Sequence, residues 1–209
     1  MSRRADPPTG AGPVQRSKGA QTRQAILDAA IGRFGRDGFR ATSVADIARD
    51  ASVGGTVAYA YFPNKERLFL AAVDEDAAAL MAEGAAAAKI VPDTREWPKA
   101  MLFAVLGVLD GHPLARRILA GLEPEVTTRV LEIPSLAELR KVCAERLRAE
   151  QLAGTARRDI DATVIANGTV AIVLSLLMSL AQLGPEAAAP YGDDVAAVFE
   201  AAIGPLPLR

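Results

Sequence analysis

Apolar residues near the start of the chain recur with the period of a helix. Ile26, Ala30 and Phe34 are each four residues apart, so a helix would carry them on a single face. We expect this helix over residues 22–37, with Gly38 as its C-terminal stop. The chain therefore begins its folded part with an amphipathic helix.

A second apolar stripe is only two turns long and is made of Val44, Ile47, Ala48 and Ala51. Ser43 can cap this helix with its hydroxyl while Asp46 reaches back, as in a capping box. Gly54 and Gly55 then permit a sharp turn, and a further short helix is expected over residues 55–62. The pattern predicts a helix-turn-helix.

The second short helix has different inner and outer faces. Ala58 and Phe62 face inward with Val53, which leaves Tyr59 and Tyr61 on the outside. A phenol hydroxyl donates well to a phosphate oxygen, so these tyrosines suit a helix that rests in a major groove of DNA. The next helix has Asn64 as its expected cap and Lys65 in its first turn, where a cation suits a bound phosphate.

These residues together resemble the DNA-binding domain of TetR-type transcriptional regulators. The matching motifs are Thr22-Arg23, Ala29-Ala30 with Phe34, Gly38-Phe39, Thr42-Ser43-Val44 with Ile47-Ala48, and Tyr59-Ala60-Tyr61-Phe62 with Lys65. The resemblance covers about 45 residues in the first third of the chain. It implies a ligand-responsive DNA-binding regulator, most often a repressor.

Several positions depart from the family pattern. Ser52 replaces the usual turn glycine, Gly54 the usual capping serine, Thr56 a frequent glycine and Ala58 a common leucine. Ala45 stands where several members carry an arginine that reaches a base. We therefore expect fewer direct base contacts and more readout of backbone and shape.

The expected DNA contacts fall into two groups, those to phosphates and those to bases or the groove. Phosphate positioning is assigned to Thr42, Ser43, Tyr59, Tyr61 and Lys65, and base or groove contact to Gly55, Thr56 and Val57.

The remaining two thirds of the chain predict further helices and no strands. Their expected ranges are 64–89, 93–110, 113–122, 125–131, 135–151, 159–183 and 186–203. The fold class is therefore all-α, with an N-terminal three-helix domain and a C-terminal helical bundle. The expected domains are a disordered basic tail (1–18), the helix-turn-helix domain (19–66) and a ligand-binding and dimerisation domain (67–209). The resemblance implies that the helix from residue 64 tilts when a ligand binds and so transmits ligand occupancy to the DNA-binding domain.

The segment 162–183 has no charged residue and matches a membrane span in length. Polar residues interrupt it, and no basic cluster flanks its C-terminal end, so burial against a partner is the favoured interpretation. The resemblance implies a homodimer through the last two helices, 159–183 and 186–203, and with it a roughly palindromic operator.

A sensor pocket for a small apolar or aromatic effector is expected inside the C-terminal bundle. Its candidate lining residues are Met81, Trp97, Met101, Phe103, His112, Asn167 and Met178. For each residue taken singly, ordinary core packing is the competing interpretation, and His112 before Pro113 also suits an exposed loop.

Charge and composition narrow the classes of function. The net charge of −1 divides into +5 over residues 1–70 and −6 over the remainder. This division is expected for a basic DNA-binding domain joined to an acidic ligand-binding domain. One cysteine excludes an internal disulfide, and one histidine leaves no zinc constellation. The N-terminus lacks an apolar signal region, which indicates a cytoplasmic protein.

No catalytic motif accompanies these features. The sequence shows no phosphate-binding glycine loop, nucleophile elbow or metal-ligand spacing, so we expect no enzymatic activity, metal or cofactor. The alternative from another class is a helical interaction protein or membrane-associated adaptor without DNA binding. Subcellular fractionation and a gel shift would separate the two.

Overall fold

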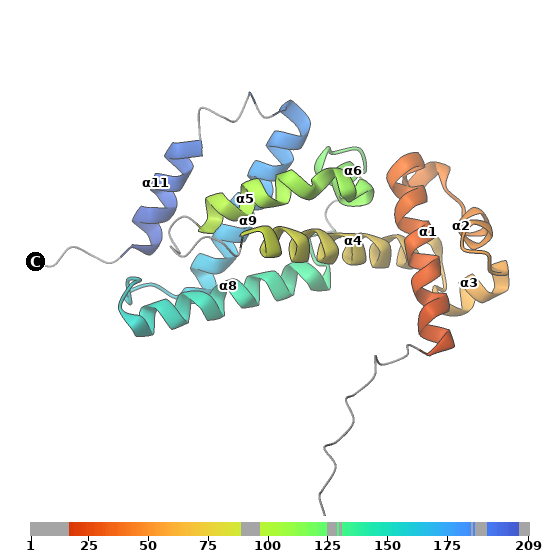
Figure 1. The fold of residues 1–209 in the computed structure, drawn as a ribbon, viewed down its shortest axis with the longest axis horizontal. Helices are drawn as coiled ribbons and strands as arrows, with labels where there is room; N and C mark the ends of the chain where they lie inside the picture. Colours follow the sequence, from red (N-terminus) through yellow and green to blue (C-terminus); the bar gives the residue numbers. More distant parts are fainter. Residues whose placement is uncertain are drawn as a thin grey trace, which may run out of the picture.

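A computed structural model describes residues 17–88, 97–124, 129, 131–184, 186 and 192–204. Every regular element in these ranges is a helix and none is a strand, which confirms the predicted all-α class. Figure 1 shows three N-terminal helices at one end and a helical body at the other, with one long helix running from the first group into the second.

The N-terminal helices are α1 (Lys18–Ala41), α2 (Val44–Asp50) and α3 (Gly55–Tyr61). α1 starts four residues earlier than predicted because the Ser17 hydroxyl accepts a hydrogen bond from the Ala20 amide at 3.3 Å. Its regular helix ends as predicted at Gly38, whose φ of 85° breaks the helix before a last short turn. We call residues 17–64 the reading head.

The long helix α4 (Lys65–Ala88) completes the core of the reading head with its first turns. Phe69 of α4 lies edge-on to Phe34 of α1, with ring centroids 5.0 Å apart, and equally close to Phe39. Ile26, Ala30 and Phe34 are fully buried, as their spacing predicted. Aromatic packing therefore fixes α4 to the helices that precede it.

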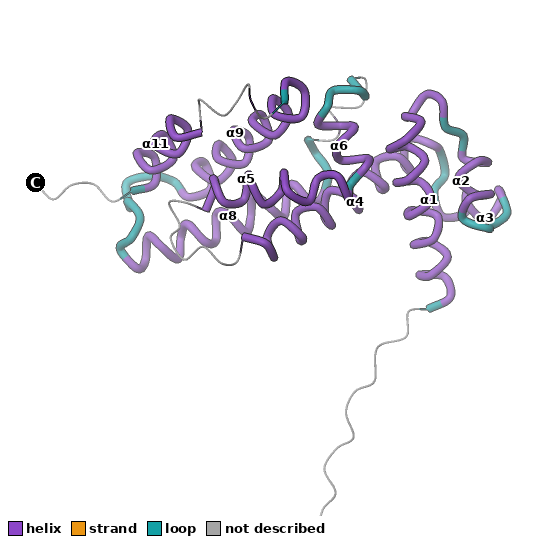
Figure 2. The backbone as a smooth tube through the Cα atoms, turned by 45° about the horizontal axis from the view of Figure 1, so that its top comes forward, coloured by secondary structure: helices purple, strands orange, loops and turns teal. Residues whose placement is uncertain are grey.

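The body is built from the rest of α4 and six further elements. These are α5 (Trp97–Val108), the 3-10 turn η1 (Leu109–Gly111), α6 (Pro113–Leu119), α8 (Pro134–Ala153), α9 (Ala162–Leu183) and α11 (Gly192–Ile203). Figure 2 shows α11 beside α9 at the end of the body away from the reading head.

Three predicted helices need comment. The helix expected from residue 159 begins at Ala162, because the Asp161 carboxylate accepts from the Thr163 and Val164 amides at 2.8 and 2.9 Å and so caps it. Most of the predicted helix 125–131 lies outside the described residues. So do residues 187–191 of the predicted helix 186–203, and residues 1–16 of the predicted tail.

α9 is apolar along its whole length but little covered within the monomer. Among the described helices it is the one long and apolar enough to cross a membrane, and only 22% of its most apolar stretch is buried. Val164, Ile172 and Leu183 are all exposed on it. Exposed apolar faces of this kind are typical of surfaces that contact another molecule or lipid.

Candidate nucleic-acid interface and ligand cavity

The outer face of α3 is open, as the sequence predicted. Ala58 is fully buried and Phe62 nearly so, whereas Val57 and Tyr59 are 41% and 53% exposed. Tyr61 is less free, because a Cβ built on Gly19 of α1 would lie only 3.3 Å from its hydroxyl oxygen. The Tyr61 hydroxyl therefore lies beside the first turn of α1. α3 offers a small, uncharged surface edged by two phenols.

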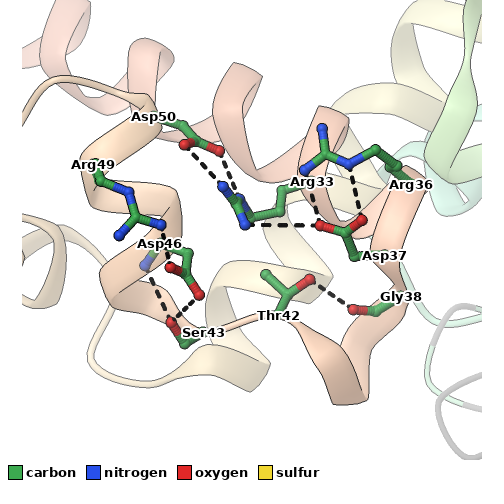
Figure 3. Close-up of polar contacts among 9 residues, drawn as sticks. All are labelled: Arg33, Arg36, Asp37, Gly38, Thr42, Ser43, Asp46, Arg49 and Asp50. Atoms are coloured by element: carbon green, nitrogen blue, oxygen red, sulfur yellow. Dashed lines mark hydrogen bonds and ion pairs between the residues drawn. The ribbon is translucent and has the colours of Figure 1, made fainter.

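The predicted Ser43 cap of α2 is present, but the Asp46 side chain bonds to a different atom than in a capping box. Ser43 Oγ accepts from the Asp46 amide at 3.1 Å and donates to Asp46 Oδ2 at 2.6 Å, so the carboxylate returns to the hydroxyl (Figure 3). Arg49 donates to the other oxygen of Asp46. The Ser43 hydroxyl bond, followed by Arg49, lowers the pKa of Asp46. A phosphate contact by the Ser43 hydroxyl would replace its bond to Asp46.

The prediction that the Thr42 side chain touches phosphate is wrong. Thr42 is only 2% exposed, and its hydroxyl donates to the Gly38 carbonyl at 2.8 Å. That bond satisfies a carbonyl at the kink of α1, where the helical ladder is interrupted (Figure 3). Thr42 closes the junction between α1 and α2.

Lys65 has a structural role that the sequence did not predict. Its half-buried ammonium donates to the Thr42 carbonyl at 2.9 Å and reaches the Arg40 carbonyl at 3.5 Å. It also lies 4.5 Å from the centroid of the Phe39 ring. These contacts tie the first turn of α4 to the end of α1 and leave one ammonium donor for a phosphate. The phosphate role of Lys65 stays a prediction.

Much of the positive charge counted in the reading head is paired internally. Arg33 of α1 holds Asp50 of α2 through bonds of 2.6 and 3.0 Å, and Arg36 holds its neighbour Asp37 (Figure 3). The Arg33 hydrogen bond lowers the pKa of Asp50, and the Arg36 hydrogen bond does the same for Asp37. These pairs cancel within the count of +5, which already subtracts their carboxylates, so the net charge of the region is unchanged.

The body contains a cavity of about 110 Å³ among α4, α5, α6, α8 and α9. Its walls are aliphatic apart from Cys143 and Thr169. The aliphatic lining residues are Val73, Ala77, Leu80, Met81, Val105, Ala115, Ile118, Leu119, Leu131, Ile133, Leu136, Leu139, Val170, Val173, Leu174, Leu177 and Met178.

Two of the seven predicted pocket residues, Met81 and Met178, line this cavity. Phe103 and Asn167 face solvent instead, and His112 is buried elsewhere, so these three predictions are wrong for this cavity. The side chains of Trp97 and Met101 lie outside the described part of the structure. Sequence reasoning missed the Leu, Ile and Val walls because their helical spacing is the same as that of ordinary core residues.

Two carboxylates of α4 bind the helices that wall the cavity. Asp76 Oδ2 accepts from the Leu114 and Ala115 amides at 3.0 and 2.8 Å, at the start of α6. Asp74 Oδ1 accepts from the Ser135 amide at 2.8 Å, at the start of α8. Each carboxylate satisfies amides that a helix start leaves free. α4 is thus hydrogen-bonded to both neighbours of the cavity.

A separate contact joins the body to the reading head. Glu123 is buried, and its Oε1 accepts from the Phe39 amide at 3.1 Å and from Arg117 Nε at 2.7 Å. Nearby, a Cβ on Gly35 would lie 2.8 Å from the Pro113 Cβ, so α1 and the start of α6 touch at backbone distance. A shift of α6 would therefore displace α1 through direct contact.

The described residues bring no three His, Cys, Asp or Glu side chains together in the manner of metal ligands.

Residues 26–72 match the family model described as bacterial regulatory proteins, tetR family. This match spans the helix-turn-helix and the start of α4. The N-terminal domain of the chain is therefore of the TetR type. The open α3 face lies within the matched helix-turn-helix.

Solved structures extend the likeness over most of the chain. A TetR-family transcriptional regulator from Cytophaga hutchinsonii is 18% identical, with a TM-score of 0.62 over 92% of this chain and 100% of its own. The fatty acid degradation regulator FadR from Bacillus halodurans is 16% identical, with 0.63 over 91% and 96%. A gamma-butyrolactone receptor, described as ArpA-like, is 19% identical, with 0.52 over 91% and 92%. At these identities the likeness shows a shared fold. No curated protein matches the chain significantly.

Proposed function

We propose that this TetR-family chain is a cytoplasmic, homodimeric repressor that leaves a roughly palindromic operator when a small apolar effector fills the body cavity. The open outer face of α3, with Val57 and Tyr59 exposed over a buried Ala58, is the observation that carries the DNA-binding part. In a helix-turn-helix, the second helix enters the major groove with such a face.

The dimer is supported by the uncovered face of α9. This helix exposes Val164, Ile172 and Leu183, and α11 lies beside it with Val198 exposed as well. Burying these apolar side chains against their copies on a second chain would give a two-fold interface. The two reading heads of such a dimer face successive major grooves, which requires two half-sites about one helical turn apart.

The effector response is supported by the cavity and its connections. α4 lines the cavity with Val73, Ala77 and Met81 and also supplies Phe69 to the core of the reading head. A ligand that shifts α4 therefore moves the reading head. Relatives of the same fold include a gamma-butyrolactone receptor and a fatty acid degradation regulator, which agrees with a small-molecule signal.

The test begins with operators selected from random DNA by the purified full chain. Replacing Lys65 with Met should weaken binding about equally on every operator and reduce the salt slope of the binding constant by roughly one. Changing Thr56 or Val57 should instead alter the preference among operators. Lys141→Met is the matched control, because Lys141 is an exposed lysine of α8 outside the reading head.

Selection that enriches no sequence, together with no gel shift on any DNA, would overturn the proposal. That result, combined with recovery of the chain in a membrane fraction, would favour the alternative in which the exposed face of α9 meets lipid. A soluble dimer that is lost on Ile172→Glu supports α9 as the interface.

A further inference from the structure

We propose that the body cavity takes an unbranched aliphatic chain, and that the polar end of the same ligand stays outside it. This inference deepens the proposed function, because it assumes that the cavity is the effector site. It narrows the apolar or aromatic effector expected from the sequence to a single chemical class.

The lining chemistry is the first argument. Among the described residues, no aromatic side chain lines the cavity. Phe34, Phe39 and Phe69 pack together in the reading head, and Phe103 faces solvent on α5. Aromatic ligands gain from stacked or edge-on rings in their sites, and the described lining residues offer them none. Aliphatic walls favour a flexible aliphatic ligand.

The lining residues of the cavity extend over about two turns on each of two helices. On α4 its lining runs from Val73 to Met81, which at 1.5 Å per residue is about 12 Å of helix. On α9 it runs from Thr169 to Met178, about 14 Å. A volume of about 110 Å³ is small for lining residues spread over that length. A compact cavity that holds one benzene ring is larger, at about 150 Å³. Lining residues spread over this length fit an extended chain better than a compact ring system.

The polar end of the ligand has no partner inside. Among the described lining residues, only Cys143 and Thr169 bring a side-chain N–H, O–H or S–H group to the cavity. His112 Nε2 is buried without a hydrogen-bond partner, but His112 is not among the lining residues. A carboxylate or hydroxyl drawn into the cavity would lose its water without replacement. The polar group therefore remains at the mouth, where Leu131 is partly exposed to solvent.

The test is a calorimetric titration of the full chain, without DNA, with hexanoate, octanoate, decanoate and dodecanoate. Affinity should rise by about fourfold per added methylene until the cavity is full. Naphthoate, which has a similar number of carbons to decanoate, should bind far more weakly. Decanol should bind as tightly as decanoate if the head group is solvated. A lower affinity for decanol would show that the site recognises the carboxylate.

Two variants locate the binding in the cavity. Val173→Phe places a larger side chain of α9 in the cavity and should weaken decanoate binding at least tenfold. Val142→Phe, on the exposed face of α8, should leave decanoate binding unchanged. The two variants add the same side chain at a lining and a non-lining site. Equal effects of both variants, equal affinity for naphthoate and decanoate, or no dependence on chain length would each overturn the proposal.

Cys143 provides a measurement that needs no substitution. It is the only cysteine of the chain and it lines the cavity. Burial raises the pKa of its thiol to about 11, so its modification by methyl methanethiosulfonate is best followed near pH 9. Decanoate at about 100 times its dissociation constant should slow the modification by roughly 100-fold. Unchanged modification would place the ligand elsewhere.

These results separate the two proposals. Chain-selective binding that leaves operator affinity unchanged supports the ligand class and overturns the effector role. Operator binding by a chain that takes up none of the alkyl probes overturns the ligand class and leaves DNA binding intact.

Discussion

Asp76 Oδ1 lies 3.0 Å from His112 Nδ1, and both side chains are buried. Because the other oxygen of Asp76 accepts two amides of α6, one carboxylate joins α4, the turn after η1 and the start of α6. A buried carboxylate is stable only when its oxygens are hydrogen-bonded in this way. The pair therefore fixes the position of α6, which walls the cavity and touches α1.

Replacing Asp76 with Ala should lower the free energy of unfolding by about 3 kcal/mol or more, because it strands two buried amides and an imidazole. Urea denaturation of both proteins measures this difference. Asp110→Ala is the control, since Asp110 is almost fully exposed and only pairs with Arg116 at the surface. A loss as large from Asp110→Ala would show that the burial of Asp76 is not the cause.

Replacing Glu123 with Ala should also destabilise the chain, by about 3 kcal/mol, since it leaves Arg117 without its buried partner. The same change removes the acceptor of the Phe39 amide, so that amide should exchange its hydrogen faster. Hydrogen exchange followed by mass spectrometry would localise the effect to the end of α1. Glu138→Ala, at an exposed pair on α8, should change neither quantity. Unchanged exchange at Phe39 would contradict the contact.

Replacing Ser52 with Gly should raise the free energy of unfolding by about 0.5–1 kcal/mol. Ser52 has a φ of 55° in the turn between α2 and α3, a left-handed conformation that costs a side chain roughly 1–2 kcal/mol. Part of that gain is offset by the greater freedom of glycine in the unfolded chain. Thermal denaturation measures the net effect. Ser52→Ala keeps the Cβ and should bring no gain, so an equal gain from it would refute the strain.

Acid should loosen the reading head as the Arg33–Asp50 pair is lost. The Arg33 hydrogen bond holds the pKa of Asp50 below its ordinary value, so the folded state binds this proton less readily than the unfolded state. The stabilisation is complete above the ordinary value, near pH 4, and is lost as the pH falls through the lower folded value. Asp50→Asn should be less stable at neutral pH and should flatten the fall of the urea midpoint below pH 4. An unchanged acid profile would contradict the role of this pair.

The helix-turn-helix was predictable in detail because its determinants are local. The Ser43 cap, the Asn64 cap, whose Oδ1 accepts from the Arg67 amide at 2.8 Å, and the Gly38 stop all act over three or four residues. Periodicity placed Ala58 and Phe62 inside and Tyr59 outside. The prediction failed at Thr42, whose hydroxyl donates to the carbonyl of Gly38, four residues back in the last turn of α1, where helical carbonyls lack a partner.

The sequence by itself determined the helices, their caps and the exposed face of α3, since hydrogen bonds within one or two turns and a period of 3.6 residues fix these. Only the tertiary structure decided which helix faces meet. It brought Asp76 to α6 across 38 residues and Glu123 to Phe39 across 84, and it gathered the cavity wall from five helices. Such contacts depend on how packed faces orient in space, and an aliphatic residue has the same spacing whether it fills a core or lines a cavity.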